Sequence, residues 1–115
     1  MLRVKIDRQE PTELFEQVAA EIRRAIADGE AKAGERLPPA RDLAAILGVN
    51  TNTVLRSLRL LRDEGLLEFR RGRGIHVAGT PEQSAVIARA HELVRFARQQ
   101  GYRTDELVRI IRSVA

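Results

Sequence analysis

The residues of this sequence that could do chemistry are mainly arginines and short polar side chains. Eighteen of the twenty basic residues are arginine, cysteine is absent, and the two histidines are His76 and His91. Without cysteine, no disulfide, thiolate metal site or cysteine nucleophile can form. No carboxylate pair, no nucleophile–base pair and no phosphate-binding glycine loop between a strand and a helix is evident. We therefore expect no catalytic residues, no metal and no cofactor, and we interpret both histidines as ordinary surface or strand residues.

The positive charge is concentrated in one stretch of the chain. Between Arg36 and His76 there are eight Arg or Lys residues and four Asp or Glu residues, whereas the rest of the chain has twelve of each. The whole net charge of +4 therefore lies in this stretch. Such clustering is typical of proteins that bind polyanions. A basic face exposed to solvent is the alternative, and a GC-rich genome would also favour arginine.

Two short segments in this stretch have residue types suited to DNA. Thr51, Asn52 and Thr53 begin a predicted helix, where they can donate to phosphates or read base edges. Asn50 before them is suited to cap the helix, and the helix N-terminus itself attracts a phosphate. The second segment, 71–74, is a basic, glycine-rich turn in which Arg73 lies between two glycines. An arginine placed there is suited to enter the minor groove of DNA.

Hydrophobic periodicity predicts the elements that position these residues. An amphipathic helix is expected from about Glu10 to Gly29, beginning near Pro11 and Thr12. A short helix over 40–47 and a turn at Gly48 lead into the helix that begins at Thr51 and ends at Gly65. Alternation on both sides of the basic turn predicts a two-stranded hairpin over 67–77. The predicted core includes Leu14, Val18, Ile22, Leu43, Leu47, Val54, Leu58, Phe69 and Val77, and Phe15 and Phe96 are also interpreted as core residues.

Two further helices are predicted after the hairpin. Thr80 is expected to cap a helix that begins at Pro81 and runs to about Gln100. Gly101 interrupts it, and a last helix begins near Thr104. The predicted fold is mainly α with a small β-hairpin, namely a winged helix-turn-helix followed by two C-terminal helices. A helix-turn-helix binds DNA by placing its second helix in the major groove.

The residues of the predicted winged helix-turn-helix resemble the DNA-binding domain of GntR-type bacterial transcription regulators. The similarity lies in the segments LPPARDLA (37–44), GVNTNTV (48–54), EGLL (64–67) and RGRG (71–74), and it covers roughly residues 10–78. By position, the resemblance implies DNA contacts from Arg41, Asn50, Thr51, Asn52, Thr53, Arg71, Gly72 and Arg73. For Arg41 the alternative is pairing with Asp42, and for Asn50 it is capping alone.

The sequence departs from the commoner GntR pattern at three positions. Pro39 replaces a serine or threonine that often caps the helix containing Arg41, and Thr51 and Leu55 occupy positions that are often arginine. The form of residues 50–54 instead resembles the YtrA-type branch of the family. Residues 78–115 are too few for the large effector domain of most GntR regulators. The YtrA-type branch is similar in having two C-terminal helices that dimerise.

Apolar side chains on the two C-terminal helices agree with dimerisation. Two short helices joined at Gly101 cannot hide both apolar strips from water, so part of this surface is expected to meet a second chain. The alternative is a monomer in which both helices fold back onto the first domain. The predicted dimerisation residues are Val86, Ala90, Leu93, Ala97, Leu107, Ile110, Ile111 and Val114.

The sequence therefore predicts two units, a DNA-binding domain over 10–78 and a helical dimerisation segment over 80–115. The expected protein is a cytoplasmic homodimer that regulates transcription as a repressor and binds double-stranded DNA at an inverted-repeat operator. Any small-molecule effector is unknown, and no membrane contact is expected. The alternative is a winged-helix module for protein interaction or for non-specific architectural DNA binding.

Overall fold

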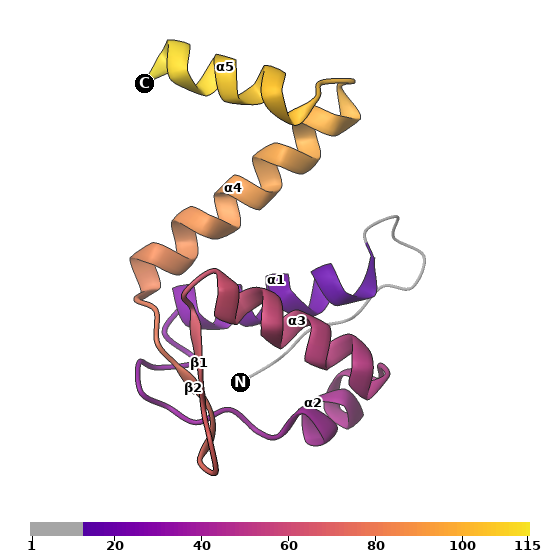
Figure 1. The fold of residues 1–115 in the computed structure, drawn as a ribbon, viewed down its shortest axis with the longest axis vertical. Helices are drawn as coiled ribbons and strands as arrows, with labels where there is room; N and C mark the ends of the chain where they lie inside the picture. Colours follow the sequence, from indigo (N-terminus) through magenta and orange to yellow (C-terminus); the bar gives the residue numbers. More distant parts are fainter. Residues whose placement is uncertain (1–12) are drawn as a thin grey trace.

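Three helices and a β-hairpin form one unit, and two further helices project from it (Figure 1). The computed structural model describes residues 13–115, so the predicted helix start at Pro11 and Thr12 lies outside the described residues. The predicted mainly α fold with a small hairpin is confirmed. The elements are α1 (Leu14–Ala27), α2 (Ala40–Leu47), α3 (Thr51–Asp63), β1 (Leu67–Arg70), β2 (Gly74–Val77), α4 (Pro81–Gln99) and α5 (Thr104–Val114).

One hydrophobic core joins α1, α2, α3 and the inner face of the hairpin. Residues at three- and four-residue steps put one apolar face of each helix into this core. Full burial of a Leu, Ile or Val side chain contributes about 1.5–3 kcal/mol. Leu14, which was also predicted for the core, is only half-buried. The predicted core residues that are buried are Val18, Ile22, Leu43, Leu47, Val54, Leu58 and Val77.

Asn50, Thr80 and Gly48 begin or end helices as predicted. Asn50 Oδ1 accepts a hydrogen bond from the backbone N–H of Asn52 at 2.8 Å and caps α3. Thr80 Oγ1 caps α4 in the same way. Pro39 precedes α2 and makes no side-chain cap, as expected. Gly48 ends α2 with φ of 69°, a left-handed conformation that glycine adopts without steric cost.

The hairpin has a third, very short strand beside it. In the hairpin itself, Phe69 pairs with Ile75 and Arg70 with Gly74 in an antiparallel register. Arg36 forms an isolated antiparallel bridge with His76, and the N–H of Leu37 donates to the carbonyl of Ile75 at 2.8 Å. The sequence did not predict this strand, because so short a segment has no alternation to detect. We call the hairpin 67–77 the wing.

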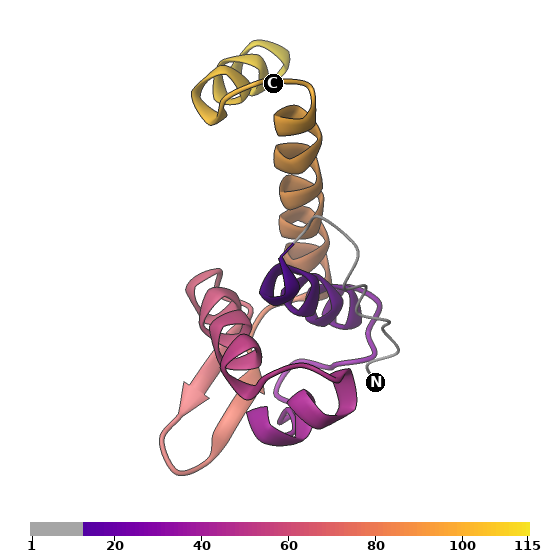
Figure 2. The ribbon, with the colours of Figure 1, turned by 90° about the vertical axis from the view of Figure 1, so that its right-hand side faces the viewer.

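The last two helices form an arm that leaves the rest of the fold. The first half of α4 packs against α1, where Ser84 Oγ donates to the carbonyl of Arg23 at 2.7 Å. The second half of α4 extends away, and α5 crosses its far end (Figures 1 and 2). We call the segment 81–114 the C-terminal arm. Over residues 13–115, none of the helices combines the length and the apolar character needed to cross a membrane.

Two phenylalanines predicted for the core are exposed. Phe69 is 38% exposed, because it lies toward the tip of the wing, beyond the buried Leu67. The guanidinium of Arg62 lies over its ring, 4.9 Å from the ring centre. Phe96 is 58% exposed, because it lies on the projecting half of α4. The prediction that both are core residues is therefore wrong. Phe15 is half-buried beneath the guanidinium of Arg56.

Candidate nucleic-acid interface

The first turn of α3 presents short polar side chains to solvent. Thr51 and Asn52 are exposed and Thr53 is half-buried. The opposite face of α3 is fixed in the core by Val54, Ser57, Leu58 and Leu61, all of which are buried. Since residues four and seven positions apart share a helix face, Asn52, Arg56 and Arg59 lie together on the outward side.

The three arginines of α3, Arg56, Arg59 and Arg62, have different surroundings. Arg56 stacks on Phe15 of α1 at 3.7 Å from the ring centre and lies 3.7 Å from a carboxylate oxygen of Glu13. Arg62 pairs with Asp63 at 3.3 Å and also covers Phe69. Among the described residues, Arg59 has no ion-pair partner. The structure thus adds Arg59 to the candidate DNA contacts. The sequence could not single it out, because the three arginines are equally spaced.

The tip of the wing is a tight turn with exposed cations. The N–H of Arg73 donates to the carbonyl of Arg70 at 2.8 Å, and Gly72 has φ of 75°, which a type II turn requires at its third position. Arg71 and Arg73 are exposed, and within residues 13–115 neither has an ion-pair partner. Arg70, just before the tip, is held by Glu68 at 3.1 Å.

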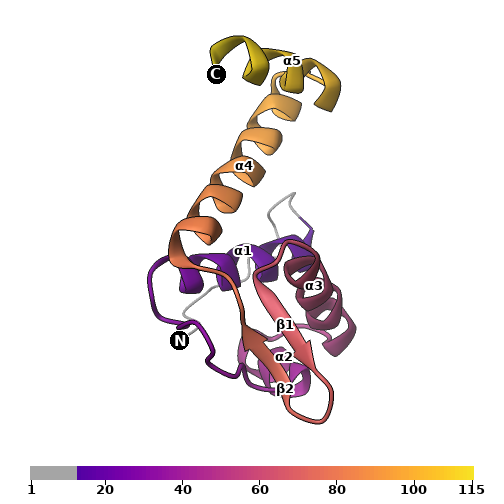
Figure 3. The same ribbon diagram turned by 60° about the vertical axis from the view of Figure 1, so that its left-hand side comes forward.

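Arg41, the start of α3 and the wing tip lie at the end of the molecule opposite the arm. Figure 1 shows α2 and the hairpin tip at this lower end, and Figure 3 shows the wing beside α3. Arg41 is exposed in the first turn of α2, and no ion pair with Asp42 forms. The structure therefore brings the predicted contact residues to one end of the fold. Asn50 is also there, with its side-chain oxygen used in capping α3.

A buried ion pair that the sequence analysis missed joins the arm to the other helices. Arg23 of α1, whose side chain is 2% exposed, donates twice to the carboxylate of Glu64, each time at 2.8 Å. His91 Nε2 of α4 lies 2.6 Å from the same carboxylate. Partial burial would raise the pKa of Glu64, but the hydrogen bonds and charges of Arg23 and His91 outweigh it and hold this pKa below its ordinary value. We call these three residues the helix joint.

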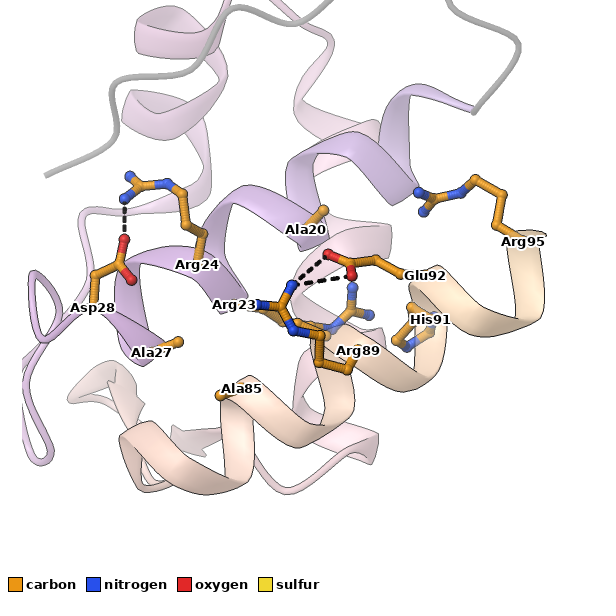
Figure 4. Close-up of a pocket in the computed structure, with 11 residues that line it drawn as sticks. Ala20, Arg23, Arg24, Ala27, Asp28, Ala85, Arg89, His91, Glu92 and Arg95 are labelled. Atoms are coloured by element: carbon orange, nitrogen blue, oxygen red, sulfur yellow. Dashed lines mark hydrogen bonds and ion pairs between the residues drawn. The ribbon is translucent and has the colours of Figure 1, made fainter. Parts of the chain in front are cut away.

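A cleft of about 420 Å³ lies between α1 and α4, next to the helix joint (Figure 4). Its floor is made of small residues, among them Ala20, Ala27 and Ala85. Most cations at its rim already have acidic partners. Arg24 bonds Glu21 and Asp28, and Arg89 bonds Glu92. In the described part of the chain, no group of three or more His, Cys, Asp or Glu side chains could hold a metal ion.

Comparison with known proteins places this arrangement in a family. The model for the gntR family of bacterial regulatory proteins matches residues 14–77. The chain is 32% identical to the HTH-type transcriptional repressor YtrA of Bacillus subtilis, over 72% of this chain and 64% of that protein. It is 34% identical to the HTH-type transcriptional regulator Rv1152 of Mycobacterium tuberculosis, over 98% of this chain and 93% of that protein.

Two solved structures extend the comparison. YtrA from Sulfolobus acidocaldarius, a GntR-family transcription factor, is 34% identical, with a TM-score of 0.62 over 96% of this chain and 95% of that chain. The AraR DNA-binding domain in complex with operator ORX1 is 26% identical, with a TM-score of 0.57 over 65% of this chain and 96% of that chain. The likeness to the Sulfolobus YtrA structure therefore includes the arm, whereas the likeness to AraR spans about two thirds of this chain.

Proposed function

This chain belongs to the gntR family of bacterial regulatory proteins, and from that premise we propose that it is a homodimeric repressor that binds an inverted-repeat DNA operator. It is a transcription regulator with a winged helix-turn-helix, and the predicted resemblance to YtrA-type members is confirmed. The repressor role is supported by the name of the Bacillus relative. The dimer, the operator symmetry and the individual DNA contacts are parts of the proposal.

The observation that carries the proposal is the set of exposed cations at one end of the fold. Neutralising a DNA phosphate with an arginine releases a condensed counterion, so such cations supply affinity for any DNA sequence. Exposed polar side chains at the start of α3 then supply the means of distinguishing base pairs. The contacts we propose are Arg41, Asn50, Thr51, Asn52, Thr53, Arg59, Arg71, Gly72 and Arg73.

The C-terminal arm supports a second copy of this chain as its partner. Of the ten large hydrophobic side chains that are exposed in the described residues, eight lie on the arm, including Val86 at 69% and Val114 at 79% exposure. A surface of this kind costs free energy in water unless another chain covers it. We therefore propose that residues 10–78 form the DNA-binding domain and that residues 80–115 form the dimer contact.

The predicted dimerisation residues divide into two groups. Ala97 and Leu107 are buried at the corner where α4 meets α5, so they hold the arm together. The others are exposed and available to the partner chain. A two-fold axis through this contact presents two α3 helices to equivalent half-sites, which is the reason for expecting an inverted repeat. The exposed members are Val86, Ala90, Leu93, Ile110, Ile111 and Val114.

A gel-shift titration with DNA from upstream of the protein's own gene tests this function. We expect a complex that resists a hundredfold or so excess of random competitor DNA and weakens steeply with salt. A footprint with two related halves would support the inverted repeat. Equal loss of the complex to specific and random competitor would instead favour architectural DNA binding, and no complex at low salt would favour a protein-interaction module.

A further inference from the structure

Arg36 lies outside both the helix-turn-helix and the wing tip, in the short edge strand that pairs with β2. Its side chain crosses the neighbouring position, Gly74. A β-carbon on Gly74 would lie 2.7 Å from Nε of Arg36, 3.1 Å from Nη2 and 3.2 Å from Cζ. The guanidinium of Arg36 therefore lies against Gly74, on the side where a β-carbon would project. The φ of 85° at Gly74 favours glycine at the end of the wing turn.

Nearby carboxylates do not neutralise Arg36. Glu68, on β1, is paired with Arg70, and Glu35 accepts a hydrogen bond from the backbone N–H of Lys32. Arg36 is exposed, and it forms no ion pair and no side-chain hydrogen bond with another residue of 13–115. Its guanidinium thus lies against the end of the wing turn, exposed and without an acidic partner among residues 13–115.

We propose that Arg36 binds a phosphate of duplex DNA beside the wing, as a cation that the edge strand adds to those of the tip. This inference rests on the proposed DNA-binding function. A guanidinium presents several N–H donors in a fixed plane, which suits phosphate oxygens.

Fluorescence anisotropy with a labelled mixed-sequence duplex of about 30 base pairs measures this contact without knowledge of the operator. Affinity is followed from about 50 to 200 mM salt for the wild type, Arg36→Ala and Arg36→Lys. We expect Arg36→Ala to bind roughly threefold to tenfold more weakly, with a salt slope lower by about one. Arg36→Lys keeps the charge and should restore the slope. Arg89→Ala, on α4, is the control for net charge.

Each alternative outcome has a definite meaning. Absence of salt-dependent binding by the wild type would contradict the proposed function itself. Wild-type binding combined with an unchanged affinity and slope for Arg36→Ala would overturn only the role of Arg36. An equal loss in Arg89→Ala would assign the effect to net charge and overturn the phosphate contact. Weaker binding at an unchanged slope would make Arg36 a support for the wing, which also overturns it.

Discussion

Asn50 and Asn52 lie two residues apart and have different surroundings. The side-chain oxygen of Asn50 accepts a hydrogen bond from the N–H of Asn52, whereas the side chain of Asn52 is exposed on the outward face of α3. An N-cap contributes about 1 kcal/mol to stability, and a good base contact contributes about 1–3 kcal/mol to discrimination. The two residues can therefore be separated by experiment.

We expect Asn52→Ala to weaken binding to the operator by about 1–3 kcal/mol and to relax the preference at one base pair. Thermal unfolding should hardly change, because the side chain is exposed. Asn50→Ala is the comparison, and it should lower the free energy of unfolding by about 1 kcal/mol. Binding measured against a set of single-base operator variants decides the matter. A uniform loss across all variants would indicate that Asn52 contacts phosphate.

Arg73 lies at the wing tip with no ion-pair partner among the described residues. Replacing it by alanine should weaken binding to every DNA sequence and lower the salt slope by about one, since one released counterion is lost. Arg70→Ala is the matched control, because Glu68 already holds that arginine. A salt titration of both variants measures the effect, and an unchanged slope for Arg73→Ala would remove the tip from the interface.

At the scale of elements, the helices were predictable because their signals are local. The caps Asn50 and Thr80 and the end at Gly48 each act within a few residues of their own position. The edge strand at Arg36 was not predictable, because its hydrogen bonds reach residues about forty positions away. The joint of Arg23, Glu64 and His91 was missed for the same reason, since α1, the C-cap of α3 and α4 each supply one of its residues.

The candidate contacts were predictable as residue types and less so as individual residues. The sequence indicated a basic stretch and polar residues at the start of α3, and the structure brings these to one end of the fold. The sequence could not distinguish Arg59 from Arg56 and Arg62. Arg56 and Arg62 differ from Arg59 in their contacts with Phe15, Glu13 and the wing, which only the structure shows. Exposure of Phe96 depends on how far α4 extends beyond α1.

The helix joint makes stability depend on acid. Because the pKa of Glu64 is lowered in the folded state, its contribution is present above the unfolded pKa, near 4.3, and is lost as pH falls through the folded pKa. Glu64→Gln should lower the free energy of unfolding at neutral pH by about 1.5–3 kcal/mol. Denaturant titrations should show the difference from wild type shrinking below about pH 4.

Glu92→Gln is the control for this prediction. Glu92 pairs with Arg89 at 3.1 Å on the exposed side of α4, and exposed pairs contribute about 0–1 kcal/mol. Its effect on stability should therefore be small at any pH. If Glu64→Gln is no less stable than Glu92→Gln at neutral pH, the joint does not stabilise the docking of α4.

For the whole molecule, the position of the arm would decide how the two DNA-binding units of the proposed dimer are presented. The helix joint and Ser84 fix the first half of α4 against α1, so the arm leaves the domain in a defined direction. The exposed apolar residues begin at Val86 and continue to the end of α5. A second chain docked on this surface would thus place its own α3 and wing at a set distance from the first. Half-sites about one helical turn apart, ~34 Å, are expected for such a pair.

Glutamate in place of Leu93 or Ile110 tests this arrangement. These side chains are 41% and 43% exposed in the single chain, so a charge there is tolerated in the monomer but costs several kcal/mol when a partner buries it. We expect both variants to fold, to sediment as monomers at micromolar concentration and to bind the operator weakly. Ile46→Glu is the matched control, because Ile46 is 60% exposed on α2, outside the arm. The Ile46→Glu variant should therefore remain dimeric. A wild type that sediments as a monomer and binds one half-site tightly would contradict the dimer.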